Sequence, residues 1–224
     1  MRLSVVIPAL NAERELPATL ACLEEARHAI AEIVVSDGGS SDGARDVAKA
    51  VGCRVIVGSR GRGSQLRRGA ELATGEWLLF LHADTRLDAG WSAAAGRFAI
   101  DAGDNRAAAF AFALDDDAPA ARRLERMVRW RGRLLALPYG DQGLLISRAL
   151  YDRLGGYADA PLMEDVDLVR RIGRRRLTIL PVRAVTSAAR YRRDGYLRRM
   201  VRNALCLTLY LGGVSPARIA RLYG

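Results

Sequence analysis

The chain has 224 residues, 50% of them hydrophobic, and it carries a formal net charge of +10. This is enough apolar material for one large α/β domain or two small ones, and no linker rich in proline, serine or glycine divides it, so we expect one. No run of about 18 uncharged apolar residues occurs, which excludes a transmembrane helix. The three cysteines lack metal-ligand spacing and indicate reduced thiols in a cytoplasmic protein.

Short β-branched apolar runs alternate with helical segments in the first part of the chain. Strands are expected at residues 3–7, 32–36, 54–57 and 77–81, and helices at 15–29, 42–51 and about 65–73. Pro8 should end the first strand, because proline lacks the amide that a sheet hydrogen bond requires. This alternation predicts parallel βαβ units.

The rest of the chain continues as a mixture of helices and strands. Helices are expected at 88–100, 122–137, 148–154, 163–173 and 195–212, and strands at 107–114, 144–147, 177–180 and 184–188. In the last helix, Leu197, Val201, Leu205 and Leu209 recur at helical spacing. We expect this apolar stripe to pack on the domain, with a membrane surface as the alternative because arginines occupy the first two turns.

Carboxylates stand at three places next to turn residues. Asp37 to Asp42 follow the second predicted strand, Asp84 follows the fourth, and Glu164 and Asp165 open a helix. Ligands of parallel sheets bind beyond the carboxyl ends of the strands, so residues 8–13, 37–42 and 82–84 should lie together. Acids there can bind the base or ribose of a nucleotide, coordinate a divalent metal or accept and release a proton. These roles suit an enzyme that acts on a sugar nucleotide. The alternative for Glu164 and Asp165 is a purely structural role, because acids in the first turn of a helix can stabilise it by interacting with the helix dipole.

Two basic features accompany these acids. The loop at 58–65 offers glycines, arginines and a helix N-terminus, a plausible phosphate cradle. Residues 170–202 contain twelve arginines and one acid, Asp194. Such a block favours a phosphate-rich ligand, an anionic membrane surface or nucleic acid, and a solvated basic face is an equally weighted alternative.

The motifs together resemble family 2 glycosyltransferases of the GT-A fold. The resemblance lies in residues 5–13, residues 32–42, His82-Ala83-Asp84 and Glu164-Asp165. Residues 60–65, 82–86, 137–143 and 162–166 are similar to a small bacterial branch associated with arsenosugar or radical-SAM biosynthetic clusters. The resemblance implies an α/β GT-A domain over residues 1–224 with a Rossmann-like, mostly parallel sheet flanked by helices. It implies a nucleotide-binding half (1–100), an acceptor half (101–190) and a C-terminal amphipathic helical tail (191–224).

The resemblance also implies roles for individual residues. Nucleotide contacts fall on Pro8, Ala9, Asn11, Glu13, Asp37, Arg62, Gln65 and Ala83. Asp84 would hold Mg²⁺ or Mn²⁺, Asp165 would be the general base of an inverting transfer, and Glu164 and Gln142 would orient the acceptor. Acceptor contacts fall on Tyr139, Asp141 and Gln142. The implied partners are a nucleotide-diphosphate sugar and a small-molecule or lipid-linked acceptor, with no nucleic acid and with peripheral membrane contact through the tail.

The chain departs from the family pattern at several positions. His82 replaces the first aspartate of the Asp-x-Asp motif, and the Gln-x-x-Arg-Trp motif is absent. The candidates to bind the diphosphate instead of this missing motif are the arginines at 170, 171 and 174–176. The alternative functions are a sugar-phosphate nucleotidyltransferase and a degenerate protein that binds nucleotides or polyanions without catalysis.

Overall fold

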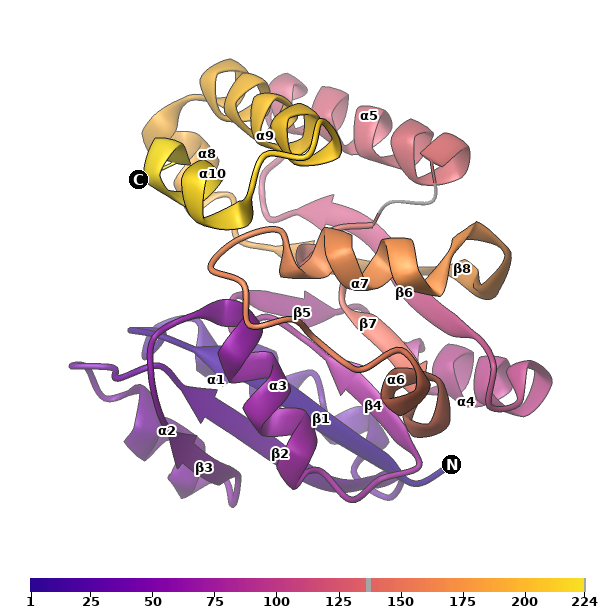
Figure 1. Cartoon of the computed structure of the whole chain (residues 1–224). Coiled ribbons are helices and arrows are strands. Elements are labelled where there is room, and N and C mark those ends of the chain that lie inside the picture. The colour runs from indigo at the N-terminus through magenta and orange to yellow at the C-terminus, as the bar shows by residue number, and fades with distance from the viewer. Residues whose placement is uncertain (136–137, 224) are drawn as a thin grey trace.

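The computed structural model describes residues 1–135 and 138–223 (Figure 1). Its strands are β1 (Leu3–Ala9), β2 (Ile30–Asp37), β3 (Arg54–Val57), β4 (Trp77–Phe80), β5 (Thr85–Leu87), β6 (Ala107–Leu114), β7 (Leu144–Ser147) and β8 (Leu177–Thr186). Its α-helices are α1 (Leu16–Ala21), α2 (Ala44–Ala50), α3 (Arg62–Leu72), α4 (Trp91–Ala102), α5 (Pro119–Leu135), α6 (Arg148–Arg153), α7 (Glu164–Ile172), α8 (Ala189–Asp194), α9 (Tyr196–Leu211) and α10 (Pro216–Tyr223). Three 3₁₀ turns are η1 (Glu24–Ala26), η2 (Gly140–Gln142) and η3 (Arg174–Arg176).

The strands form one sheet in the order β3-β2-β1-β4-β7-β6-β8-β5. The pairs among β3, β2, β1 and β4 are parallel, β7 is antiparallel to both of its neighbours, and β8 is parallel to β6. Strands β1, β2, β3, β4, β6 and β8 therefore all run in the same direction. Their carboxyl ends meet at one edge of the sheet, where an α/β protein binds its ligands.

Helices cover both faces of this sheet, as the alternation of side chains along β1 requires. Val5 and Ile7 of β1 join the core under α1 and α4, whereas Val6 joins the core under α3, α6 and α7. Helix α3 approaches β1 so closely that a Cβ at Gly69 would lie 2.4 Å from Val6 Cγ1. A third cluster, around Phe112, joins the end of β6 to α5, α8 and α9.

The predicted elements differ from the structure at several places. Strand β1 continues through Pro8, because β4 pairs with β1 only as far as Val6 and leaves the later part of β1 unpaired on that side. Helix α1 ends at Ala21, since η1 and a turn lead the chain into β2 at Ile30. The predicted strands at 177–180 and 184–188 form the single strand β8, which has an irregularity opposite Phe110 and Ala111. The short elements β5, α8 and α10 were not predicted. The predicted end of the helix at 137 falls outside the described residues.

Most of the apolar stripe of the tail does not pack on the domain, although its fourth residue, Leu209, is partly buried. Leu197, Val201 and Leu205 lie on the exposed face of α9, while Arg199 and Cys206 occupy its buried face. The expectation of core packing is therefore wrong, because helical spacing defines a face of a helix but not the side that the domain covers. None of the helices within the described ranges is both long and apolar enough to cross a membrane.

Candidate functional site

Two cavities lie at the edge of the sheet where the carboxyl ends of β1, β4 and β8 meet. The larger cavity has a volume of about 660 Å³, within the range of small-molecule sites, and the smaller one about 130 Å³. Six residues belong to the walls of both, namely Arg62, His82, Asp84, Leu162, Ser187 and Arg190. Ligands in the two cavities would therefore meet at the same side chains.

The loops after β1 and β2 are joined by hydrogen bonds beside the larger cavity. The amide of Asn11 donates to Ser40 Oγ (2.9 Å), and the amide of Ser41 donates to Asn11 Oδ1 (2.9 Å). The amide of Gly43 donates to Glu13 Oε2 (3.1 Å). Asn11 has a φ of 50°, a left-handed conformation that is uncommon for residues other than glycine. These contacts fix the shape of the loop that forms this wall.

Asp37 lies at the end of β2 and is fully buried. Its Oδ2 accepts hydrogen bonds from the amides of Gly39 (2.8 Å) and Ser40 (2.9 Å), whereas its Oδ1 has no partner in the part of the chain that the structure describes. Burial raises the pKa of this carboxyl, but the donors of Ser40 and Gly39 lower it by more, so the pKa lies below its usual value. The ionised side chain keeps one unused acceptor oxygen beneath the loop.

The N-terminal part of α3 carries Gln65, which links three elements. Its Nε2 donates to the carbonyl of Ala9 (2.7 Å) at the end of β1 and to the carbonyl of Ser36 (2.8 Å) in β2. The side chain is 4% exposed. Gln65 therefore fixes α3 against the strand ends and forms part of the wall of the larger cavity.

An ion pair between Arg62 and Glu164 joins α3 to α7. Arg62 Nε donates to Glu164 Oε1, and the side chain of Glu164 is fully buried while that of Arg62 is 34% exposed. Burial raises the pKa of Glu164 and Arg62 lowers it, and the net pKa lies above the usual value. Burial lowers the pKa of Arg62, but Glu164 and Asp165 raise it by more, so the guanidinium stays charged. Arg62 presents this charge to both cavities.

Three carboxylates, those of Asp84, Asp141 and Asp165, line the smaller cavity. Asp165 Oδ2 accepts a hydrogen bond from the amide of Gly140 (2.7 Å). Burial raises the pKa of Asp141, Arg131 lowers it, and Asp165 and Asp84 raise it further, to about 6. Negative charge is thus concentrated where a cation or a proton would be stabilised.

His82 lines both cavities and closely approaches Gly140. A Cβ at Gly140 would lie 2.6 Å from His82 Nε2 and 3.4 Å from Asp165 Oδ2, so glycine is required for this close contact. Burial lowers the pKa of His82 most, and the charges of Arg62 and Arg190 lower it further. Asp165 raises it, but the pKa still falls to about 3. The imidazole is therefore neutral near pH 7.

The chain after β8 adds two arginines that the sequence motifs did not single out. The amide of Ser187 donates to the carbonyl of Asp84 (3.1 Å), which places the start of α8 beside the strand end of β4. Arg190 lines both cavities and Arg193 lines the larger one. Arg193 pairs with Asp194 (2.8 Å), whereas Arg190 forms no ion pair with any residue that the structure describes. Applying the strand-end rule to the predicted strand at 184–188 would have identified both.

The arginines considered as diphosphate contacts lie elsewhere. Arg170, Arg171 and residues 174–176 are outside the walls of both cavities. They surround the end of α7 and the amino end of β8, so they lie away from the strand ends that form the site. Arg171 pairs with Asp167. That expectation is wrong, because α7 starts at the site and carries the chain away from it.

The profile of Glycosyl transferase family 2 matches residues 4–131, which is more than half of the chain. The chain belongs to this family. Among family relatives, the PGL/p-HBAD biosynthesis glycosyltransferase of Mycobacterium tuberculosis is 40% identical over 91 residues. That match covers 38% of this chain and 36% of the relative, so the chain spans little more than a third of the relative's length.

Several solved structures share the fold of this chain. Glucosyl-3-phosphoglycerate synthase from Mycobacterium tuberculosis, solved with Mn²⁺ and UDP-glucose, has a TM-score of 0.66 at 20% identity, covering 95% of this chain and 79% of its own. S. aureus TarS, solved with UDP, has a TM-score of 0.64 at 17% identity, covering 84% of this chain and 61% of its own. These similarities confirm the predicted α/β fold of the GT-A type.

Most of the side chains predicted from the family 2 motifs line the two cavities. Those of the larger cavity are Pro8, Ala9, Asn11, Arg62, Gln65, Ala83 and Asp84, and those of the smaller are Tyr139, Asp141, Asp165 and again Arg62 and Asp84. Four others lie outside these walls, namely Glu13, Asp37, Gln142 and Glu164. Glu164 pairs with the wall residue Arg62, and the other three form hydrogen bonds behind the walls; Gln142 Nε2, for example, donates to the carbonyl of Phe110 (2.8 Å).

Proposed function

We propose that this family 2 protein transfers a sugar from a nucleotide-diphosphate donor to a hydroxyl acceptor with inversion. The observation that carries the proposal is the pair of cavities that share one wall. A donor in the larger cavity and an acceptor in the smaller one would react at that wall. This arrangement supports a two-substrate transfer, and nothing in it favours a sugar-phosphate nucleotidyltransferase.

The donor nucleotide would lie against the loop after β1 and the start of α3. Asn11 and Arg62 line that part of the cavity, and Asp37 Oδ1 beneath the loop is a buried acceptor without a partner among the described residues. A buried acceptor of this kind suits an N–H donor of a base or a hydroxyl of ribose. Because TarS binds UDP and the glucosyl-3-phosphoglycerate synthase binds UDP-glucose, we propose a uridine nucleotide as the donor.

Asp165 would act as the general base. It lines the smaller cavity, and its hydrogen bond from Gly140 holds the carboxylate in place. The acceptor hydroxyl would give its proton to Asp165 while its oxygen bonds to the anomeric carbon, and the bond from that carbon to the diphosphate oxygen would break. Attack opposite the leaving group inverts the configuration at the carbon. Arg62 and Arg190 would stabilise the charge of the departing diphosphate.

The site fits a divalent metal that binds together with the donor. Within the described ranges no group of three or more His, Cys, Asp or Glu side chains forms a complete metal site. Magnesium and manganese ions are commonly held by one or two carboxylates plus the phosphates of the substrate, and Asp84 is placed to be that carboxylate. When bound, such an ion would neutralise charge on the leaving diphosphate.

A thermal-shift panel tests the proposal. UDP, GDP, CDP, ADP and TDP would each be added with and without Mn²⁺, and we expect UDP with Mn²⁺ to raise the melting temperature most, because a ligand of the native state stabilises it by mass action. In Asp84→Ala, the metal should no longer strengthen nucleotide binding. Absence of any shift in the wild type would contradict the proposed donor, and a metal effect that persists in Asp84→Ala would contradict the ligand role of Asp84.

Arg190→Ala should lower transfer activity by about tenfold or more, because a charge that faces the leaving group is lost while no ion pair among the described residues is broken. Arg192→Ala is the matched control. Arg192 lies two residues away on α8, outside both cavities, and pairs with Asp115 and Asp116 (3.5 Å each). Steady-state kinetics and melting temperature would be measured for both variants. Equal activity in the two would remove Arg190 from the mechanism.

Three narrower predictions accompany this proposal. They concern the lipid-linked class of acceptor, the resemblance to the arsenosugar or radical-SAM branch, and the cytoplasmic location. All three stay predictions.

A further inference from the structure

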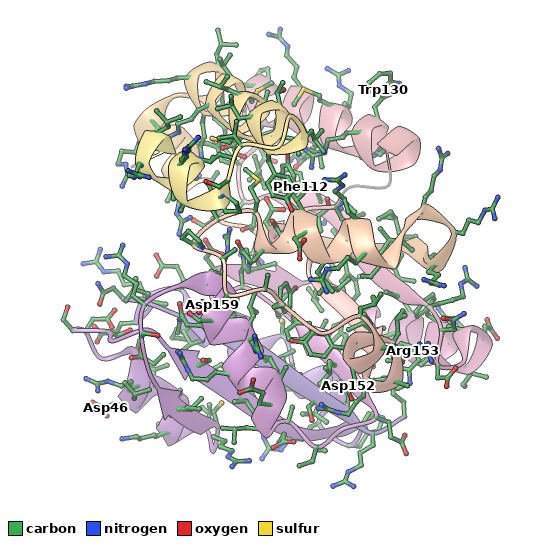
Figure 2. All side chains as sticks on the ribbon, in the orientation of Figure 1. Asp46, Phe112, Trp130, Asp152, Arg153 and Asp159 are labelled. Atoms are coloured by element: carbon green, nitrogen blue, oxygen red, sulfur yellow. The ribbon has the colours of Figure 1, made fainter. Side chains whose placement is uncertain are left out.

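The outer faces of α5 and α9 expose large apolar side chains. On α9, Leu197, Val201 and Leu205 are 74%, 60% and 55% exposed. On α5, Trp130 is 65% exposed, and Figure 2 shows it on the outer side of that helix. Apolar side chains gathered on a surface, unlike single ones, mark an interaction site.

The helices that carry these side chains lie next to one another. Helix α9 contacts both α5 and α10, and Figure 1 shows α5 and α9 side by side at one end of the molecule. Leu124 and Val128 of α5 and Met200 of α9 pack on the cluster around Phe112. The opposite faces of both helices therefore point away from the domain. We call this region the outer helical surface, formed by Met127, Trp130, Leu197, Val201 and Leu205.

Arginines dominate the charge of the helices that carry the outer helical surface, and the acids that flank these helices, Asp117 and Asp194, both pair with arginines. Residues 195–224 contain five arginines and no acidic residue. Helix α5 contains six arginines, and its only carboxylate, Glu125, is buried. The exposed apolar side chains therefore share their helices with exposed arginines, namely Arg123, Arg126 and Arg129 of α5 and Arg198 of α9.

We propose that the outer helical surface docks the protein on a bilayer that carries anionic headgroups. The apolar side chains would enter the boundary between headgroups and acyl chains, Trp130 would lie at that interface, and the arginines would reach the phosphates. A second copy of the chain is a poorer occupant, because two arginine-rich faces would repel each other. An anionic lipid surface complements both the charge and the apolar stripe.

Docking in this orientation would leave the acceptor site one helix, α9, away from the membrane. The inner face of α9 contributes Arg199 and Asn203 to the smaller cavity, while its outer face forms part of the outer helical surface. This consequence rests on the proposed function: the acceptor would be an amphiphile that stays anchored in the bilayer while its hydroxyl enters the cavity. The docking itself does not depend on catalysis and can be measured without it.

The test is binding of the full chain to vesicles of phosphatidylcholine, with or without phosphatidylglycerol. We expect binding only when phosphatidylglycerol is present. Trp77 and Trp91 are buried, so the exposed Trp130 should dominate changes in emission on binding, with a shift to the blue and quenching by brominated acyl chains. The double variant Val201→Asp and Leu205→Asp should lower the partition coefficient by about tenfold or more, because two apolar contacts become charged.

Ile100→Asp is the matched control. Ile100 is 83% exposed on α4, away from the outer helical surface, so its partition coefficient should equal that of the wild type. The UDP thermal shift of every variant would be recorded, which separates a failure of docking from a failure of the proposed function. The proposal would be overturned by no binding to anionic vesicles, by unchanged binding of the double variant, or by a dimer in solution that the double variant abolishes.

Discussion

Replacing Asp165 with asparagine should reduce transfer by about a hundredfold or more while leaving nucleotide affinity near that of the wild type. The side chain lines the smaller cavity but not the larger one, so the donor site should be preserved. Asparagine can still accept the hydrogen bond from the amide of Gly140, so the wall should keep its shape. What the variant loses is the ability to take the proton of the acceptor hydroxyl.

Asp167→Asn provides the control for this variant. Asp167 lies on the same helix, is outside both cavities and pairs with Arg171, so its replacement changes the charge of α7 without touching the site. Single-turnover transfer and UDP affinity would be measured for both variants. Turnover of Asp165→Asn equal to that of Asp167→Asn would exclude Asp165 as the base. A loss of UDP affinity in Asp165→Asn would instead assign it a role in binding the donor.

Strands with a clear local signal were predicted closely from the sequence. The bounds of β3, β6 and β7 match the predicted ranges 54–57, 107–114 and 144–147. Each of these runs is apolar and is bounded by glycine, charged or turn residues, which is a local property that sequence patterns capture. The strand-end rule then placed residues 8–13 and 82–84 at one edge, as the sheet order confirms.

Elements that depend on distant partners were not predictable in this way. Strand β5 has only three residues, Thr85 to Leu87, and exists because it pairs with β8 about a hundred residues later. Strand β8 was split in two because its irregularity, between the partners Leu180 and Arg183, interrupts the apolar pattern. Neither feature leaves a signal within a short window of sequence.

The site shows the same division between local motif and distant contact. Asp84 and Asp165 follow from motifs at a strand end and a helix start, and both line the smaller cavity. Arg190 was missed because it is one of twelve arginines between residues 170 and 202, and only the path of β8 selects it. Glu164 was expected to assist catalysis at the acceptor, yet the fold places it behind the wall, where it pairs with Arg62.

Replacing Arg62 with methionine should destabilise the protein by about 3 kcal/mol, because it leaves the fully buried Glu164 without its cation. For a chain of this length, that corresponds to a fall of roughly 6–12 °C in melting temperature. The matched control is Arg67→Met on the same helix, because Arg67 pairs with Glu71 in solvent (3.1 Å) and should lose at most about 0.5 kcal/mol. Equal melting temperatures for the two variants would show that the buried pair does not stabilise the fold.

The loss of stability in Arg62→Met should grow as the pH rises. Burial raises the pKa of Glu164 and Arg62 lowers it, so removing Arg62 should raise that pKa further. The native variant then keeps a proton that the unfolded chain releases above about pH 4.3, and its stability falls as the pH rises from there through the native pKa. We therefore expect a larger destabilisation near pH 8 than near pH 5. Adding Glu164→Gln to Arg62→Met should restore part of the stability, because no buried charge remains, but it should not restore transfer, because the guanidinium facing both cavities is still missing.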